Sequence, residues 1–280
     1  NDVGKKSVTW NEDMSPSRFS KVITLLNLDN HKTDLSGKIA IYEHPDVNTP
    51  EPNFVRSLYK TVYDPIKDDG EGTSLASVLV YKGFTDGFNE GLQNTIVAEW
   101  IGRYNQVYDA HEVAIKLAKY YNSKILFENN IPNFIQYCKD KGYYYMLQRT
   151  PWDAIKNFVK DPSRKYEVGI TWNKQLDVNA EQLIRQWLLD PFVRVENKML
   201  INIDNLYSLR LVRELAAYTR DGNFDHVSSL KLLMMWLNQE TTKIYTMDDL
   251  HPPDKDKELY EYKVHQINTE KHEYTNWYKY

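Results

Sequence analysis

The sequence predicts an α/β protein with a mixed five-stranded sheet flanked by helices. Between residues 58 and 101, three short β-rich runs follow one another with glycine-bearing turns between them, which is typical of an antiparallel meander. After residue 106, helical and strand-like periods alternate, which is typical of parallel strands joined by helices. We therefore expect three antiparallel strands followed by parallel strands.

The predicted antiparallel strands cover residues 59–63, 75–81 and 95–101. A helix is predicted over residues 107–121, because apolar residues recur there at steps of three and four and would share one face. The apolar run 125–127 predicts a buried strand directly after this helix. These strands form the first part of the predicted sheet, and the helix connects the last two of them.

A second helix-and-strand step follows the buried strand. Asn129, Asn130 and Pro132 mark the start of a helix that ends near Gly142, and residues 143–147 are again strand-like. The later half is predicted to be mostly helical, with helices over residues 183–189, 206–218 and 224–237 and one strand over residues 166–172. Three antiparallel strands followed by alternating helices and strands is the order of the ribonuclease H-like fold.

The chain divides into three predicted parts. Residues 1–57 read as a lead-in segment packed on the main domain, with a strand-like stretch and proline-bearing connectors. Residues 58–245 form the main domain, and residues 246–280 form a charged, polar tail or extension. The first residue is Asn1 rather than Met, so we expect the chain to be a piece of a longer protein.

The composition of the 280-residue chain excludes several classes of protein. Lys and Arg number 35 against 39 Asp and Glu, so the net charge is −4 and any contact with a polyanion must be local. One cysteine, Cys138, excludes a disulfide framework and a multi-thiolate metal site. The apolar runs are too short for a membrane span, and no secretory signal opens the sequence.

Three acidic residues lie at the ends of predicted elements. Asp64 follows the first strand, Glu128 ends the buried strand, and Asp225 begins the last strong helix. Each alone also fits a structural role, as an Asp-Pro turn or as an acid at a helix start. Together they suit a hard cation such as Mg²⁺ or Mn²⁺, which prefers oxygen ligands. Two such ions about 4 Å apart would activate a water and stabilise the leaving oxygen, so the predicted chemistry is phosphodiester hydrolysis.

Four segments, three of which contain these acids, follow one another along the chain. They are Tyr63-Asp64-Pro65 with residues 72–80, then residues 125–130, 168–174 and 224–230. Together they resemble the nuclease domain of the large terminase subunit of tailed bacteriophages, over about residues 58–237. The segment 37–45 also resembles the part that joins these nucleases to their packaging ATPase, which agrees with the missing start methionine.

The resemblance implies an endonuclease with a ribonuclease H-like fold that cuts double-stranded viral DNA concatemers at the start and end of head filling. It implies that Asp64, Glu128 and Asp225 are catalytic metal ligands, for two Mg²⁺ or Mn²⁺ ions once DNA is bound. It also implies a covalently linked N-terminal packaging ATPase outside this chain, with the portal protein and the small terminase subunit as further partners. The site of action would be the cytoplasm of the infected bacterium.

The sequence departs from the family pattern at two positions. Many relatives carry another acid near the position of Thr73, for which Glu71 is the candidate here, with Asp68 and Asp69 as the other options. Many also carry Asp-Asp where this chain has an Asp followed by His226. His226 is either a group beside the metal ligands or the DNA, or an ordinary exposed helix histidine.

Basic residues provide candidate contacts to DNA. Lys174 matches a lysine that the family places near phosphate, and it equally fits a solvated loop lysine. Five other basic residues are candidates for a local DNA track, since phosphate contacts dominate non-specific affinity: Arg149, Arg164, Lys165, Arg185 and Arg220.

Two other interpretations stay open. The first is a different ribonuclease H-like nuclease, such as a junction resolvase or an integrase relative, which would use the same acids on a different DNA substrate. The second is a catalytically silent interaction module, in which the acids are caps and turns and the polar tail binds a partner such as a portal ring. Specificity for a branched substrate would separate the first, and the absence of a metal-dependent thermal shift would favour the second.

Overall fold

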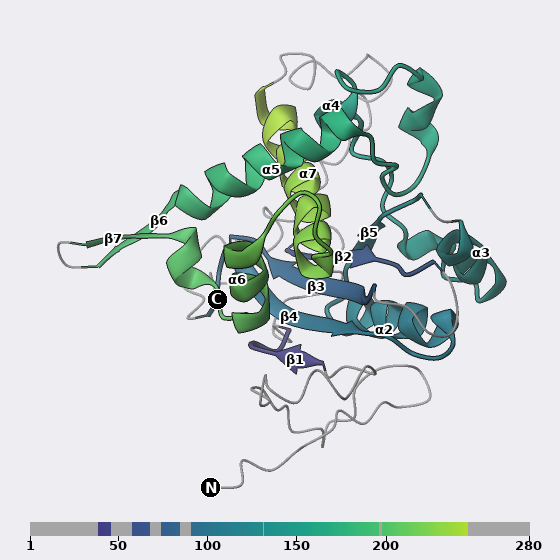
Figure 1. Cartoon of the computed structure of the whole chain (residues 1–280), viewed down its shortest axis with the longest axis horizontal. Helices are drawn as coiled ribbons and strands as arrows, with labels where there is room; N and C mark the ends of the chain where they lie inside the picture. The colour runs from purple at the N-terminus through teal and green to yellow at the C-terminus, as the bar shows by residue number, and fades with distance from the viewer. Residues whose placement is uncertain are drawn as a thin grey trace, which may run out of the picture. The chain divides into compact units, whose positions relative to one another are not determined.

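The computed structural model describes residues 39–45, 58–67, 74–84, 91–130, 132–195 and 198–245 (Figure 1). The chain divides into two compact units, Asn1–Asn238 and Gln239–Tyr280, and the elements that carry the predicted site belong to the first. The predicted tail, most of the predicted lead-in and the acids at positions 68, 69 and 71 lie outside the described residues. None of the helices described has the length and apolar character of a membrane span.

A mixed five-stranded sheet with the strand order β1-β4-β3-β2-β5 is the centre of the first unit. Its strands are β1 (Ala40–Ile41), β2 (Tyr59–Asp64), β3 (Ala76–Lys82), β4 (Thr95–Gly102) and β5 (Lys124–Phe127). The strands β2, β3 and β4 pair antiparallel, as the sequence predicts. The strand β5 pairs parallel with β2, which confirms the expected crossover through the helix between β4 and β5. The short strand β1 pairs antiparallel with β4 at the opposite edge.

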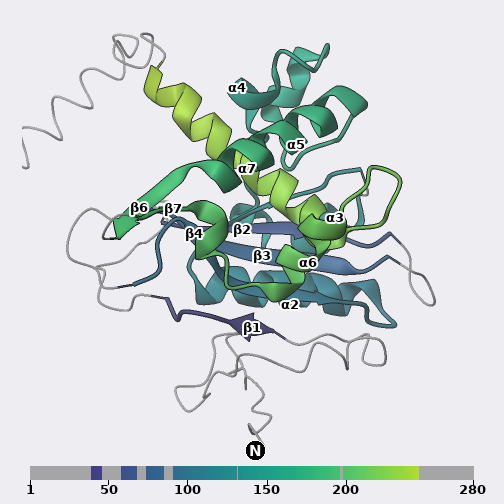
Figure 2. The same cartoon turned by 60° about the vertical axis from the view of Figure 1, so that its left-hand side comes forward.

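Helices cover both faces of this sheet. The first face carries α2 (Val107–Tyr120) and α3 (Asn133–Asp140), which share a core with Tyr59 and Tyr63 of β2. The second face carries α4 (Trp152–Ile155), α5 (Lys174–Leu189), α6 (Leu209–Ala217) and the first part of α7 (Asp225–Tyr245), which share a core with Val62. Figure 2 shows α2 and α7 on opposite sides of the sheet. Alternate residues of β2 therefore enter different cores, as the period of a strand requires.

Capping side chains explain where two of these helices begin. The Asn173 side chain accepts hydrogen bonds from the backbone N–H of Gln175 and of Leu176, at 3.0 Å each, so α5 begins at Lys174. This start lies well before residue 183, where the apolar period predicts the helix. The Ser208 hydroxyl accepts from the backbone N–H of Leu211 and fixes the start of α6. Both caps satisfy donors that a helix leaves without internal partners.

Two predicted strands are wrong. Residues 143–147 form the short 3-10 helix η2 (Tyr144–Met146), because the backbone N–H of Tyr143 still bonds the Cys138 carbonyl at the end of α3. Only Leu147 bridges the sheet, against Ile125 of β5. Residues 166–172 form two isolated bridges instead of a strand. The fifth strand of the sheet is therefore β1, and β2–β5 is the parallel strand pair of the described sheet.

The remaining described elements lie between α4 and α7 in the sequence. A hairpin that the sequence does not predict joins β6 (Pro191–Val195) to β7 (Lys198–Ile201), and two further 3-10 helices are η3 (Pro162–Tyr166) and η4 (Asn202–Asn205).

Candidate functional site

Asp64 and Glu128 lie side by side because β2 and β5 are parallel neighbours. Tyr63 stands opposite Phe127 in the register of this pair, and the backbone N–H of Glu128 donates to the Tyr63 carbonyl at 3.1 Å. Val62 and Leu126 point into the core beneath α7, so the residues two positions farther along each strand share that face. These residues are Asp64 and Glu128. The carboxyl ends of two parallel strands thus present two carboxylates on one face.

Asp225 reaches the same place from α7. It is the first residue of the helix and is 8% exposed. One of its carboxylate oxygens accepts a hydrogen bond from the backbone N–H of Leu75, at 3.0 Å, just before β3 begins. Ser77 of β3 stands opposite Asp64 in the register, so this contact fixes the start of α7 next to the end of β2. The three acids predicted as a site are therefore brought together.

The electrostatics of the three carboxyls show how close they are. Burial raises the pKa of Asp64 well above its usual range, and the charges of Glu128 and Asp225 raise it further. Burial also raises the pKa of Glu128, and its hydrogen bond with Asp64 acts in the opposite direction. The bond raises the pKa of Asp64 and lowers that of Glu128, so it favours the protonated form of Asp64 and the ionised form of Glu128. Burial raises the pKa of Asp225 to about 6.

The donor chemistry of this cluster fits a hard divalent cation. Carboxylate oxygens are the ligands that Mg²⁺ and Mn²⁺ prefer, and a cation could take the place of the proton between Asp64 and Glu128. Within the ranges described, no group of three or more His, Cys, Asp or Glu side chains is gathered closely enough to hold an ion as it stands. The three carboxyls are thus close enough to influence one another, and Asp64 and Glu128 share a hydrogen bond.

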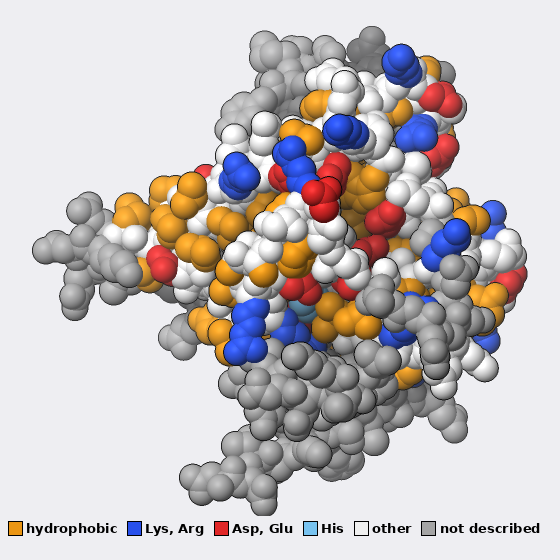
Figure 3. Space-filling model, viewed as in Figure 1, with side chains coloured by type: hydrophobic (Ala, Val, Ile, Leu, Met, Phe, Trp, Pro, Cys, Tyr) orange, Lys and Arg blue, Asp and Glu red, His pale blue; other side chains and the backbone are white. Residues whose placement is uncertain are grey.

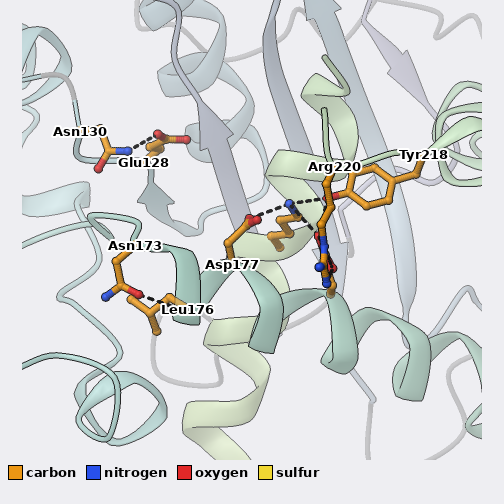
Figure 4. A network of polar contacts seen from close by, with 9 residues as sticks. Glu128, Asn130, Asn173, Leu176, Asp177, Tyr218 and Arg220 are labelled. Carbon is orange, nitrogen blue, oxygen red and sulfur yellow. Dashed lines mark hydrogen bonds and ion pairs between the residues drawn. The ribbon is translucent and has the colours of Figure 1, made fainter. Parts of the chain in front are cut away.

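A second polar cluster joins α5 to α7 beside Glu128 (Figure 4). The Lys231 ammonium donates to the Asp177 carboxylate at 2.6 Å and to the Tyr218 hydroxyl at 2.9 Å. The charge of Asp177 raises the pKa of Glu128 and the charge of Lys231 lowers it. Neither residue belongs to the predicted site, although a lysine inside the apolar run 230–237 is a signal that the helix buries a paired charge.

His226 is buried, and the expectation of an exposed helix histidine is wrong. Its side chain is 0% exposed, with Nδ1 2.7 Å from the Ser77 hydroxyl and Nε2 3.5 Å from a carboxylate oxygen of Glu99. Glu99 is also buried and accepts hydrogen bonds from Tyr42 and Ser208. The imidazole therefore belongs to a polar network inside the protein, where it cannot contact DNA, and it follows directly after Asp225 in α7.

Glu214 of α6 also holds the start of α7. Its carboxylate accepts hydrogen bonds from the backbone N–H groups of His226 and Val227, at 3.0 and 3.2 Å. Burial raises the pKa of Glu214 to about 7, and the charge of Asp225 adds to the shift. Sequence reasoning does not find this residue, because the cap is supplied from another helix.

The candidate DNA contacts are spread over several elements. Lys174 is exposed in the first turn of α5. Arg220 pairs through two nitrogens with the carboxylate of Glu181 on α5. Arg149, Lys165 and Arg185 are exposed and Arg164 is half-buried. Figure 3 shows Lys and Arg side chains around α4 and α5, with acidic side chains below them on the same face.

Comparison with known protein families finds no family that matches the chain, and comparison with curated proteins finds no match either.

Proposed function

We propose that this protein is a metal-dependent endonuclease that hydrolyses phosphodiester bonds of double-stranded DNA. The observation that carries the proposal is the juxtaposition of Asp64, Glu128 and Asp225, whose shared burial raises the pKa of all three carboxyls. Such shifts concentrate at functional sites, because a purely structural position gains nothing from carboxylates that repel one another. The strand order β4-β3-β2-β5 with the parallel β2–β5 pair supports a ribonuclease H-like fold for the enzyme.

The three acids would hold the cation, with Asp64 and Glu128 on the sheet and Asp225 on α7. When bound, Mg²⁺ or Mn²⁺ would supply positive charge for the scissile phosphate and for the attacking water. The Leu75 amide keeps the Asp225 carboxylate turned toward the strand end. Lys231 provides a fixed positive charge that favours the ionised form of Glu128. Asp64 would give up its proton for the cation to bind, so metal binding is expected to weaken in acid.

The proposal extends to the biological role that the sequence resemblance implies. The segments that resemble terminase nucleases include all three acids, and in the structure these acids lie in one cluster. We infer that the natural substrate is a viral DNA concatemer cut during genome packaging in the cytoplasm of the infected bacterium. The packaging ATPase, the portal protein and the small terminase subunit would then be the partners.

The test is cleavage of supercoiled plasmid by the purified chain with Mn²⁺, with Mg²⁺ and with a chelator. Asp64→Asn and Asp225→Asn are expected to abolish nicking and linearisation, because each removes a ligand charge at nearly constant shape. Asp140→Asn, an exposed acid at the end of α3, is the matched control and is expected to cut like the wild type. Cutting by Asp64→Asn at the wild-type rate would overturn the proposal.

A silent interaction module is the second candidate function. It is favoured by the absence, among the residues described, of a group of acids already spaced to hold an ion. In that case, Asp225 would act as a first-turn acid and Asp64 as part of an Asp-Pro turn. A folded chain that cuts no plasmid and gains no thermal stability from Mn²⁺ would support this candidate over the nuclease.

A further inference from the structure

A basic pocket lies beside the acid site, between the segment after α4 and the start of α5. It is an open pocket of about 470 Å³, and the residues that line it include Trp172 and three with cationic side chains, Lys160, Arg164 and Lys174. Among the residues described, none of these three cations forms an ion pair. In a chain with a net charge of −4, three cations around one pocket are a local concentration of positive charge.

The Asp161 carboxylate in this pocket offsets only part of that charge, one negative charge against three positive ones, and it interacts with Arg164. Asp161 accepts a hydrogen bond from the backbone N–H of Ser163, at 2.9 Å, within its own turn. The first-turn amides of α5 are likewise occupied, because the Asn173 side chain accepts from them. The positive character of the pocket therefore depends on the three cationic side chains, and two of them, Lys160 and Lys174, are exposed to solvent.

Hydrogen bonds connect the pocket wall to the acid site through one residue. The Asn130 side chain accepts from the backbone N–H of Trp172 at 3.1 Å and donates to the Glu128 carboxylate at 2.6 Å. A hydrogen bond also joins the two walls of the pocket, because the Asn173 side chain donates to the Phe158 carbonyl at 3.0 Å. The pocket is thus held at a fixed position next to Glu128, which is what a subsite for a neighbouring part of the same substrate requires.

We propose that this pocket binds a backbone phosphate of the DNA strand next to the bond that is cut. The inference rests on the proposed nuclease function and adds the place where the substrate is held. Lys160, Arg164 and Lys174 neutralise the phosphate, and Trp172 supplies a flat apolar surface for the adjoining sugar or base. Binding there fixes which phosphodiester reaches the carboxylates, so the pocket positions the substrate and takes no part in the chemistry.

The test compares two triple variants with the same loss of charge. Lys160→Gln, Arg164→Gln and Lys174→Gln remove the pocket cations. Lys116→Gln, Lys119→Gln and Lys139→Gln remove three lysines of α2 and α3, on the other face of the sheet. Affinity for a labelled 30-base-pair duplex is measured in chelator over a range of salt concentrations. The pocket variant is expected to bind at least tenfold more weakly, with a salt slope smaller by about 1, as the loss of one neutralised phosphate requires.

The control variant is expected to bind within twofold of the wild type. Equal losses in the two triple variants would mean that net charge alone matters, and unchanged binding by the pocket variant would also overturn the inference. Circular dichroism checks folding, and the single variant Lys174→Gln, which changes one exposed side chain, repeats the measurement with a smaller expected loss.

Cleavage with Mn²⁺ separates this inference from the proposed function. If the pocket variant cuts like the wild type with an unchanged KM, the proposed nuclease function is kept and the proposed subsite is wrong. A raised KM with little change in kcat is the result that the subsite predicts, because the pocket holds substrate and leaves the acids intact. Pocket-dependent binding without any metal-dependent cutting would leave a DNA-binding pocket and overturn the nuclease.

Discussion

We expect the buried carboxylate of Asp225 to make the folded protein less stable at neutral pH. Burial raises its pKa from 3.8 to about 6. Between about pH 4 and pH 6 the folded state therefore binds more protons than the unfolded state, so the free energy of unfolding falls as the pH rises. Asp225→Asn is expected to raise stability by about 1–3 kcal/mol at pH 8 in chelator and to have little effect at pH 4.

Urea denaturation of the wild type and of Asp225→Asn at pH 4, 6 and 8 checks this prediction. The pH dependence should become shallower without vanishing, since Asp64, Glu128 and Glu214 also have raised pKa values. Asp140→Asn serves as the control and should change stability by less than about 0.5 kcal/mol at each pH, as exposed sites usually do. A loss of stability at pH 8 would show that the Asp225 carboxylate is needed by the fold.

Among the residues of the site, the sequence predicts those that lie at the end of a strand, because the strand itself determines their position. Asp64 ends β2 and Glu128 follows β5, and because these two neighbouring strands are parallel, strand direction alone puts both residues at the same end of the sheet. Asp177 and Glu214 join the site region only because α5 and α6 pack near α7, and the sequence spacing does not contain that packing. His226 shows the same limit, because its burial depends on Ser77 and Glu99 from other strands.

Gly169 packs against Phe127 and Asn129, the residues on either side of Glu128. A substitution at Gly169 therefore tests how this segment holds Glu128. The φ of Gly169 is +75°, and a Cβ there would lie 2.7 Å from the Phe127 carbonyl oxygen and 3.1 Å from the Asn129 Cβ. Gly169→Ala should therefore add a clash of about 1–3 kcal/mol to the left-handed strain of about 1–2 kcal/mol. Relief of the clash would move the residues on either side of Glu128, so cleavage is also expected to slow.

Gly142→Ala is the matched control for this prediction. Gly142 has nearly the same φ, +74°, and a Cβ there meets nothing within 4 Å. It should lose only the strain of about 1–2 kcal/mol and keep full cleavage. Thermal denaturation and plasmid cutting of the two variants give the comparison. Equal stability losses would mean that the close approach at Gly169 is relieved without cost.

The bond between Lys231 and Asp177 joins α7 to α5, and a double-mutant cycle measures it. The ammonium is 9% exposed and the carboxylate 39%, so the pair is worth more than a surface ion pair. Lys231→Met is expected to cost about 1–3 kcal/mol, and adding Asp177→Asn should cost less than the sum, with a coupling of about 1 kcal/mol. The pair of Lys156 with Asp153, 41% and 33% exposed, is the control and should couple by less than about 0.5 kcal/mol.

Elements were predictable where a strong apolar period covers the whole element. The run 107–121 is one such case, and α2 covers Val107–Tyr120. The start of α5 was missed because Asn173, a polar cap, marks it rather than an apolar residue. Residues 143–147 have the composition of a strand, but Tyr143 completes the end of α3 and the next two tyrosines are exposed, at 45% and 59%. The local end of α3 and the exposure of these side chains therefore outweigh the propensity for a strand there.

At the scale of the whole first unit, the sheet separates two kinds of interior. The α2 face is filled mainly by apolar and aromatic side chains, whereas the α7 face combines an apolar core with the acids, Lys231 and the network around Glu99. The acids lie at the end of the parallel strand pair, and the basic pocket lies beside them. Negative charge for a cation and positive charge for a phosphate are thus next to each other, although the chain as a whole is acidic.

This arrangement predicts that a divalent cation stabilises the whole molecule in a pH-dependent way. Mn²⁺ at 1,000 times its dissociation constant would add about 4.1 kcal/mol to the free energy of unfolding, or roughly 8–16 °C in Tm for a domain of this size. The shift should grow from pH 5.5 to pH 8, because the cation competes with the protons of Asp64, Glu128 and Asp225.

Differential scanning fluorimetry with Mn²⁺ over that pH range provides the measurement, with Asp64→Asn and Asp225→Asn as variants that should lose the shift. Asp225→Asn is especially informative, because it is expected to be more stable than the wild type without metal and less stable with it. A reversal of rank on adding Mn²⁺ would link the instability of the carboxyl cluster directly to cation binding. A wild-type Tm that does not respond to Mn²⁺ at pH 8 would instead favour the interaction module, with carboxyls that are held together by a proton alone.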